Sequence, residues 1–308
     1  GEDTIGFSSA PLHQAAAAIA SDRVAPYRDL LRTYQPHDTE HYIRYVNNLM
    51  VLAWLGNDSL AKEQIEHSGE LYRLTHCEAY IGTYGYKPGN GLLVRQDHVA
   101  QFPGQGIAYG RAEAWGMYTA AAAYALGDDD LRARFRPWFS RIAQLIAAGQ
   151  STCSGNITSK RIDNYMSGLY LTRQSFELAF VINALESMRR TVFEGTDLAM
   201  QHLIEDVIVA ATYTTVQAPF WDASLGGQRR AVGVGLSDMS QPDFCQTIPT
   251  QAYLGLNYLE TQSAMTPWAY AYRFTHDPLF LQRAAEYMQG SGNLQHELES
   301  TWSTQLPH

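Results

Sequence analysis

The sequence predicts an all-α fold, an α/α toroid in which helix pairs form an inner and an outer ring, built as a single domain over residues 1–308. Three observations predict it. Turn signals recur about every seventy residues, the helical segments before and after each turn differ in polarity, and long connections rich in Gly and Tyr separate successive pairs. Hydrophobic residues make up 45% of the chain and charged residues 17%, which is enough for a large core and excludes a disordered chain.

The predicted turns share one pattern, in which an apolar segment meets a break and an acidic residue then opens a second helix. They are centred on Gly56, Gly127, Gly195 and His276. We expect Gly to take the left-handed conformation that ends a helix, and Asp or Thr after it to cap the next helix. Pro278 suits the first turn of a helix, where its missing N–H is not needed. The pattern therefore predicts four helical hairpins, and residues 11–34 are a candidate for a partial further pair.

The two helices of each predicted pair differ in composition. Residues 112–126 and 178–185, in first helices, are apolar or small on nearly every face. Residues 131–146 and 279–288, in second helices, carry charges at helical spacing. We therefore expect the first helix of each pair to be buried and the second to face solvent.

The connections between pairs contain short extended segments. Residues 80–86 place an aromatic or a small residue at alternate positions and lead into Pro-Gly-Asn-Gly at 88–91, a pattern typical of a strand and a hairpin turn. A second such stretch runs from Trp221 to Gly235. Because functional residues concentrate on long loops held by a rigid scaffold, we expect the site at the end of the fold where these loops lie.

Residues 110–117, with the sequence Gly-Arg-Ala-Glu-Ala-Trp-Gly-Met, open one predicted inner helix. Together with the four turns, this segment resembles the α/α-toroid carbohydrate-active enzymes, which include six-hairpin glycosidases and several polysaccharide lyases, over about residues 38–290. The resemblance implies cleavage of glycosidic bonds of a poly- or oligosaccharide in a cleft at the loop end. Only four pairs are clear, so we expect an incomplete or open ring, and no diagnostic signature separates a hydrolase from a lyase.

The densest group of polar residues lies before and inside the first turn of that inner helix. It contains Asp97, His98, Gln105, Tyr109, Arg111 and Glu113. An acid/base hydrolase, the slightly preferred interpretation, needs two carboxyl groups, and Asp97 and Glu113 could supply them. We expect Glu113 to be the acid, because its apolar neighbours would raise its pKa by desolvation. In the competing structural interpretation, Glu113 caps the helix or pairs with Arg111.

A lyase would use other residues of the same region. His98 or Tyr109 would be the base that removes a proton next to a uronate carboxylate, and Arg111, Asn156 or Arg173 would face that carboxylate. Further predicted substrate-binding residues are Gln105, Tyr109, Asn156, Arg161, Asp163, Arg173 and Trp221. A sugar ring could stack on Trp221, although Trp in such folds more often belongs to the core. Arg173 and Glu177, four residues apart, could also form a simple salt bridge on one helix face.

One motif supports a different class of enzyme. Residues 37–41, His-Asp-Thr-Glu-His, match the H-x-x-E-H pattern in which His37 and His41 would bind zinc and Glu40 would act as base. The sequence around it lacks the mixed α+β context of such peptidases, and no third ligand is evident downstream. We therefore expect no cofactor, with a zinc-dependent hydrolase as the lesser alternative.

The remaining partner classes follow from charge and hydropathy. The net charge of −9, without a Lys/Arg cluster, argues against nucleic-acid binding. No apolar run approaches the roughly 20 residues needed to span a bilayer, so we expect no membrane insertion. The chain begins Gly-Glu-Asp without Met, which indicates a removed signal or tag and suggests a secreted or periplasmic protein. The main alternative to a glycan-cleaving enzyme is a non-catalytic helical repeat module that binds a glycan or a protein.

Overall fold

The structure is a computed structural model, and it describes residues 46–75, 99–100, 103–104, 106–107, 109–152, 154–157, 160–162, 169–218, 220–224, 227–229, 231–236 and 265–291. Within these residues the chain is mainly helical, which confirms the all-α prediction. The predicted strand and turn at 80–91 and the candidate partial pair at 11–34 lie outside the described residues.

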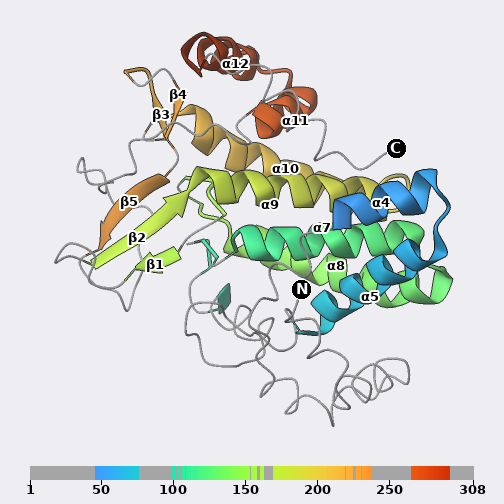
Figure 1. Cartoon of the computed structure of the whole chain (residues 1–308). Helices are drawn as coiled ribbons and strands as arrows, with labels where there is room; N and C mark the ends of the chain where they lie inside the picture. The colour runs from blue at the N-terminus through green and yellow to red at the C-terminus, as the bar shows by residue number, and fades with distance from the viewer. Residues whose placement is uncertain are drawn as a thin grey trace. The chain divides into compact units, whose positions relative to one another are not determined.

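Each predicted turn joins two helices (Figure 1). The pairs are α4 (Val46–Leu55) with α5 (Ser59–Thr75), α7 (Arg111–Leu126) with α8 (Asp129–Gly149), α9 (Ser175–Met188) with α10 (Leu198–Val216), and α11 (Met265–Thr275) with α12 (Pro278–Ser291). A π-helical turn, η4 (Arg189–Phe193), extends α9 before the third break. The four predicted hairpins are therefore present among the described residues.

An Asp caps the second helix of every pair. The cap bonds run to the Oδ1 atoms of Asp58, Asp128, Asp197 and Asp277 from the backbone N–H groups of Ala61, Leu131, Met200 and Leu279 at 2.8 to 3.0 Å. Of the three turn glycines predicted to be left-handed, only Gly195 takes that conformation, with φ of 69°. Asn57 and His276 take that conformation in two other turns, with φ of 50° and 56°. Gly56 is instead required by space, because a Cβ there would lie 2.7 Å from the Leu52 carbonyl oxygen.

The predicted contrast between buried and solvent-facing helices holds for the α7–α8 pair and in part for the α9–α10 pair. α9 is buried on nearly every face and residues 119–123 of α7 are fully buried, whereas α8 alternates buried and exposed positions. α10 has exposed positions only up to Asp206, and none of its residues 207–216 is exposed. The prediction is wrong for α4, whose Val51, Leu52 and Leu55 are exposed, the last at 85%. An apolar helix is buried only where neighbours cover it. Among the side chains of α4 that the structure describes, Val46, Met50 and Ala53 are buried in the core, at the spacing of one helix face.

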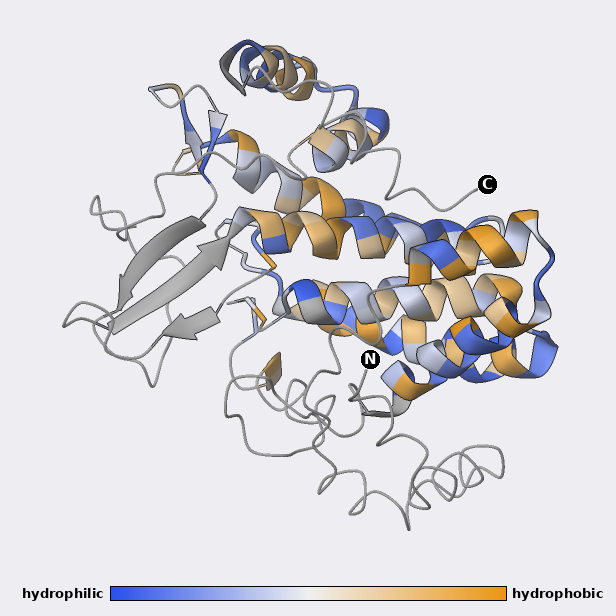
Figure 2. Cartoon of the chain, viewed as in Figure 1, coloured by the Kyte–Doolittle hydropathy of each residue, from blue (hydrophilic) through white to orange (hydrophobic). Residues whose placement is uncertain are grey.

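The chain divides into two compact units, Gly1–Asp97 with Trp115–Phe135, and His98–Ala114 with Arg136–His308. In the first unit α5 approaches α7 through small residues. A Cβ on Gly69 would lie 2.6 Å from the Cβ of Ala123, and one on Gly116 would lie 2.0 Å from the ring of Tyr72. Figure 2 shows hydrophobic and hydrophilic residues alternating along α5, as expected of a helix with one packed face.

The second unit contains the strands. β1 (Lys160–Ile162), β2 (Leu169–Gln174) and β5 (Ala231–Leu236) form an antiparallel sheet in the order β1-β2-β5, and β3 (Trp221–Asp222) pairs with β4 (Gly227–Gln228). The extended stretch predicted from Trp221 to Gly235 is therefore present. β2 runs directly into α9, and its last residue, Gln174, pairs with Ala231.

Candidate functional site

Glu113 closes the first turn of α7. Its Oε2 accepts the backbone N–H of Gly110 at 2.9 Å, and the Gly110 carbonyl accepts the N–H of Ala114 at 3.0 Å. A Glu in the third helical position that bonds back to the N-cap residue is one half of a capping box. The side chain is nearly buried, at 6% exposure. The capping role considered for Glu113 from the sequence is therefore observed.

Glu177 holds the same position in the first turn of α9, as the third residue of that helix. Its carboxylate lies against Gly110, since a Cβ built on that glycine would be 3.2 Å from Oε2 and 3.5 Å from Oε1. Glu177 is 5% exposed. Two nearly buried carboxyl groups, from the first turns of two helices, thus border the same glycine.

Two segments are hydrogen-bonded to each other just before this glycine. The N–H groups of Gly104, Gly106 and Ile107 donate to the carbonyls of Ala148, Gly149 and Ile157 at 3.0, 2.6 and 3.0 Å. Gly104 and Gly106 have φ of 70° and 93°, the left-handed region that favours glycine. The segment entering α7 is therefore bonded along the segment that leaves α8.

The second of these segments is fixed against α10. Gln150 Nε2 donates to the carbonyls of Gly155 and Val207 at 2.7 and 2.9 Å. A Cβ on Gly155 would lie 2.3 Å from the Ala210 carbonyl oxygen, so only glycine allows this approach. Thr214 of α10 also hydrogen-bonds to the Ser154 carbonyl.

The β3–β4 hairpin is attached to the start of α9. Ser175 Oγ, on the first residue of the helix, donates to the Arg229 carbonyl at 2.7 Å. Arg229 in turn donates its backbone N–H to the Phe220 carbonyl at 2.6 Å and forms an ion pair with Asp222. The pKa of Asp222 is held below its usual range by the hydrogen bond from the Ser224 hydroxyl and by the Arg229 charge. These bonds fix the helix turn that carries Glu177.

The structure brings together some of the residues predicted for the site. Tyr109 and Asn156 are buried in the two bonded segments, and Arg111 is the first residue of α7. Trp221 opens β3 and is also buried, with its ring against Trp268 and the Arg283 guanidinium 4.6 Å from its centroid. The predictions for Asp97, His98, Gln105, Asp163, His37, Glu40 and His41 lie outside the described residues.

Two predicted arginines belong to strands. Arg161 lies in β1 opposite Leu171, and Arg173 lies in β2 opposite Val232. The suggestion that Arg173 and Glu177 share one helix face is therefore wrong. The helix begins only at Ser175, because the residues before it pair with β5.

Glu177 was not among the site residues predicted from the sequence. A signal for it was present, because Glu177 follows the start of α9 at the same spacing by which Glu113 follows the start of α7. The missing information was the approach of Gly110, which comes from a segment more than sixty residues away.

Two carboxyl groups that lie close together are one arrangement that can transfer protons. Among the described residues there is no group of three or more His, Cys, Asp or Glu side chains that could hold a metal ion. No described helix is long and apolar enough to cross a membrane.

Comparisons with protein-family models, curated proteins and solved structures find no match to the chain.

Proposed function

We propose that the chain is a carbohydrate-active enzyme with an open α/α-toroid fold, which cleaves glycosidic bonds of a poly- or oligosaccharide at the loop end of its helix pairs. Acid/base hydrolysis is preferred over elimination. The observation that carries the proposal is the pair of nearly buried carboxyl groups, Glu113 and Glu177, that both lie next to Gly110. Glycoside hydrolysis requires two such groups, one to protonate the leaving oxygen and one to act as base or nucleophile.

The bond from Gly110 to Glu113 suggests one division of the roles. A carboxylate oxygen that accepts an N–H is favoured in its ionised form, and Glu113 accepts the Gly110 N–H. We therefore assign Glu113 as the carboxylate and Glu177 as the acid, which reverses the role expected for Glu113 from its sequence neighbours. In this scheme Glu177 gives its proton to the glycosidic oxygen as the bond to the anomeric carbon breaks. Water then supplies the new hydroxyl group on that carbon and gives its remaining proton to the Glu113 carboxylate.

The test uses a panel of neutral and uronate-containing glycans. New reducing ends without the ultraviolet absorbance of unsaturated uronates would identify a hydrolase, and that absorbance would identify a lyase. We expect Glu177→Gln and Glu113→Gln to lose at least about a hundredfold in kcat/KM, the size of effect that a general acid or base supplies. The matched control is Glu70→Gln, which removes another buried carboxylate, paired with Arg73 and Arg134. Full activity in both site variants would contradict the assignment.

One observation supports a second candidate, a non-catalytic helical repeat module that binds a glycan or a protein. Glu113 already serves as a helix cap, and a capping carboxylate needs no further role. Such a module would bind members of the panel without releasing reducing ends. Its Glu113→Gln variant would lose stability while retaining affinity.

A further inference from the structure

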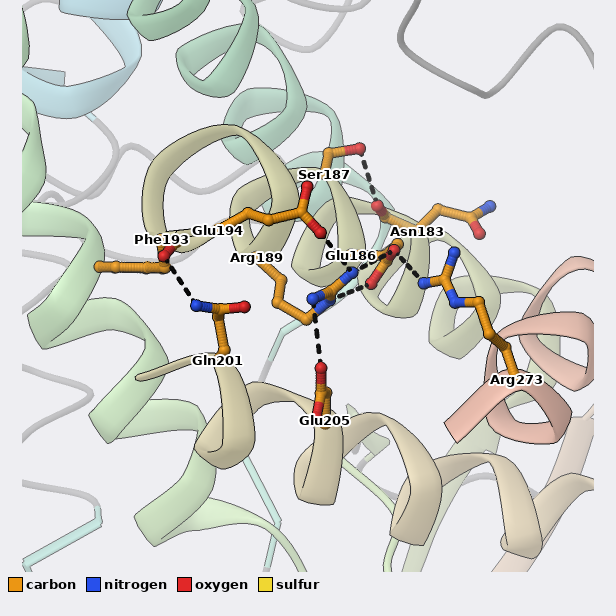
Figure 3. Close-up of polar contacts among 9 residues, drawn as sticks. All are labelled: Asn183, Glu186, Ser187, Arg189, Phe193, Glu194, Gln201, Glu205 and Arg273. Atoms are coloured by element: carbon orange, nitrogen blue, oxygen red, sulfur yellow. Dashed lines mark hydrogen bonds and ion pairs between the residues drawn. The ribbon is translucent and has the colours of Figure 1, made fainter. Parts of the chain in front are cut away.

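A second group of charged side chains lies further along α9, where that helix, η4, α10 and α11 meet (Figure 3). Glu186 is buried and accepts two bonds from Arg189, at 2.7 and 3.1 Å, and one from Arg273 of α11. Arg189 also donates to Glu205 of α10 at 3.1 Å. Burial disfavours the charge of Arg189, but the hydrogen bond and charge of Glu186, with Glu205 and Glu194, raise its pKa above the usual value.

Three polar groups beside this cluster have bonding capacity that the described residues do not use. Asn183 is 6% exposed, and neither its Oδ1 nor its Nδ2 has a partner there. The guanidinium of Arg273, whose side chain is 45% exposed, donates only to Glu186 among the described residues. The hydroxyl of Tyr270, one helical turn before Arg273, makes no hydrogen bond within the described part of the chain. Figure 3 shows the amide of Asn183 and the guanidinium of Arg273 on the same side of Glu186.

The unpaired amide is the informative feature. A buried amide without a hydrogen-bond partner is costly, and native proteins seldom leave both of its atoms unused. Asn183 precedes Glu186 by three residues on α9, so it is a neighbour of Glu186 along one helix face. Arg273 reaches Glu186 from α11, which places an accessible cation on the same side of Glu186 as the unpaired amide.

The charges around Tyr270 are of both signs. The Glu186 carboxylate acts on this residue more strongly than either of the two cations, Arg273 and Arg190. Burial, and then the charge of Glu186, raises the pKa of Tyr270 to about 12, so its hydroxyl remains a donor at neutral pH. The guanidinium, the amide N–H₂ and the phenol are all hydrogen-bond donors. An oxyanion is the ligand whose acceptor oxygens match them.

We propose that Asn183, Tyr270 and Arg273 form a binding site for a small oxyanion, a carboxylate or a phosphate, at the junction of α9 and α11. The guanidinium N–H groups of Arg273 that do not contact Glu186 would bind two oxygens, as arginine does with carboxylates and phosphates. Asn183 would add a third contact through Nδ2. Asn183 lies about 9 Å beyond Glu177 along the helix axis, at 1.5 Å per residue, so the site is distinct from the carboxyl pair. It does not depend on the proposed catalytic function.

Titration calorimetry with the full chain tests the site, using sodium glucuronate in one arm and inorganic phosphate in the other. We expect saturable binding of at least one probe, and the stronger arm identifies the source of the oxyanion. Arg273→Gln should weaken binding at least about tenfold, as the loss of a charge-assisted hydrogen bond does. Arg273→Lys should weaken it less, because it keeps the charge and loses the fork. Arg141→Gln is the matched control, since Arg141 is exposed and lies on α8.

Asn183→Leu separates binding from folding. Replacing an unpaired buried amide by an apolar group of similar size should raise the melting temperature, while the anion affinity falls at least about threefold because one donor is lost. Absence of saturable binding in both arms, or unchanged affinity in both Asn183→Leu and Arg273→Gln, would overturn the site. Glycan cleavage by the same preparations would be unaffected by that result, so the two proposals fail separately.

Discussion

Gly110 is the residue on which the candidate site depends most closely. Its backbone conformation is open to any residue, since no left-handed φ is involved, but a Cβ would lie 3.2 Å from Glu177 Oε2. That contact is tighter than ordinary packing, so an added methyl group must displace the carboxylate. The glycine therefore provides space for Glu177, and backbone freedom is not what the position requires.

Gly110→Ala should reduce kcat/KM by about tenfold or more, because small displacements of catalytic groups have large effects on rate. Gly195→Ala is the contrasting control. Gly195 has φ of 69° with nothing within 4 Å of a Cβ, so its substitution should lower stability by about 1 kcal/mol and leave turnover unchanged. Measuring kcat/KM and the melting temperature of both variants checks the two expectations. A fully active Gly110→Ala enzyme would show that the position of Glu177 is not critical.

A second prediction at the residue scale concerns pH. Tyr213 donates its hydroxyl to Asp277 Oδ2 at 2.6 Å, and this bond, with the N–H of Leu279, lowers the pKa of Asp277. A carboxyl whose folded pKa is depressed adds stability above its unfolded pKa, near 3.9, and that stability is lost as pH falls through the folded value. Tyr213→Phe should therefore melt below the wild type near neutral pH, and the difference should shrink on acidification below about pH 4. A difference that stayed constant down to about pH 2 would contradict this linkage.

At the scale of elements, Glu186 joins α9 and η4 to α11 through two guanidinium groups. Removing its charge leaves the buried Arg189 without its main partner. We expect Glu186→Gln to lower the free energy of unfolding by about 3–5 kcal/mol, the usual effect of breaking a buried pair from one side. Urea denaturation measures it.

Glu194→Gln is the matched control for that measurement. Glu194 is about half exposed and lies 3.7 Å from Arg189, so its loss should change stability by less than about 1 kcal/mol. Equal destabilisation by the two substitutions would mean that burial of the pair contributes little.

The helices and strands also show which features of the fold can be predicted from nearby residues in the sequence. The four breaks and the Asp caps were predictable because a cap is made within three residues of the helix it starts. The burial of α4 was not predictable, because its exposed Leu55 depends on which neighbours cover the helix. The sequence interpretation placed Arg173 in a helix. It could not reveal the pairing of Arg173 with Val232, because that pairing joins segments about sixty residues apart.

In the candidate site, too, features set by nearby residues could be predicted and long-range contacts could not. Tyr109, Arg111 and Glu113 could be selected from one short segment, since a polar first turn on an apolar helix is visible locally. Glu177 could not, because its relation to Gly110 arises only when two hairpins pack.

At the scale of the whole molecule, successive hairpins of the second unit are bonded through their turns. Arg136 of α8 donates to the Thr196 hydroxyl in the turn before α10, at 3.1 Å, and Tyr213 of α10 bonds to Asp277 in the turn before α12. Arg283 of α12 donates back to the Val216 carbonyl at the end of α10. Within the second unit, α8, the α9–α10 hairpin and the α11–α12 hairpin are thereby bonded in chain order, the nearest-neighbour pattern expected of stacked helical repeats.

The central claim is that Glu113 and Glu177 work as an acid–base pair, and the pH dependence of kcat/KM tests it most directly. For the wild type on a cleavable glycan we expect a bell-shaped profile, because one carboxyl group must be ionised and the other protonated. In Glu177→Gln the residual rate should lose the alkaline limb, since no acid is left to deprotonate. Glu70→Gln should keep the full bell. An unchanged profile in Glu177→Gln would contradict the claim.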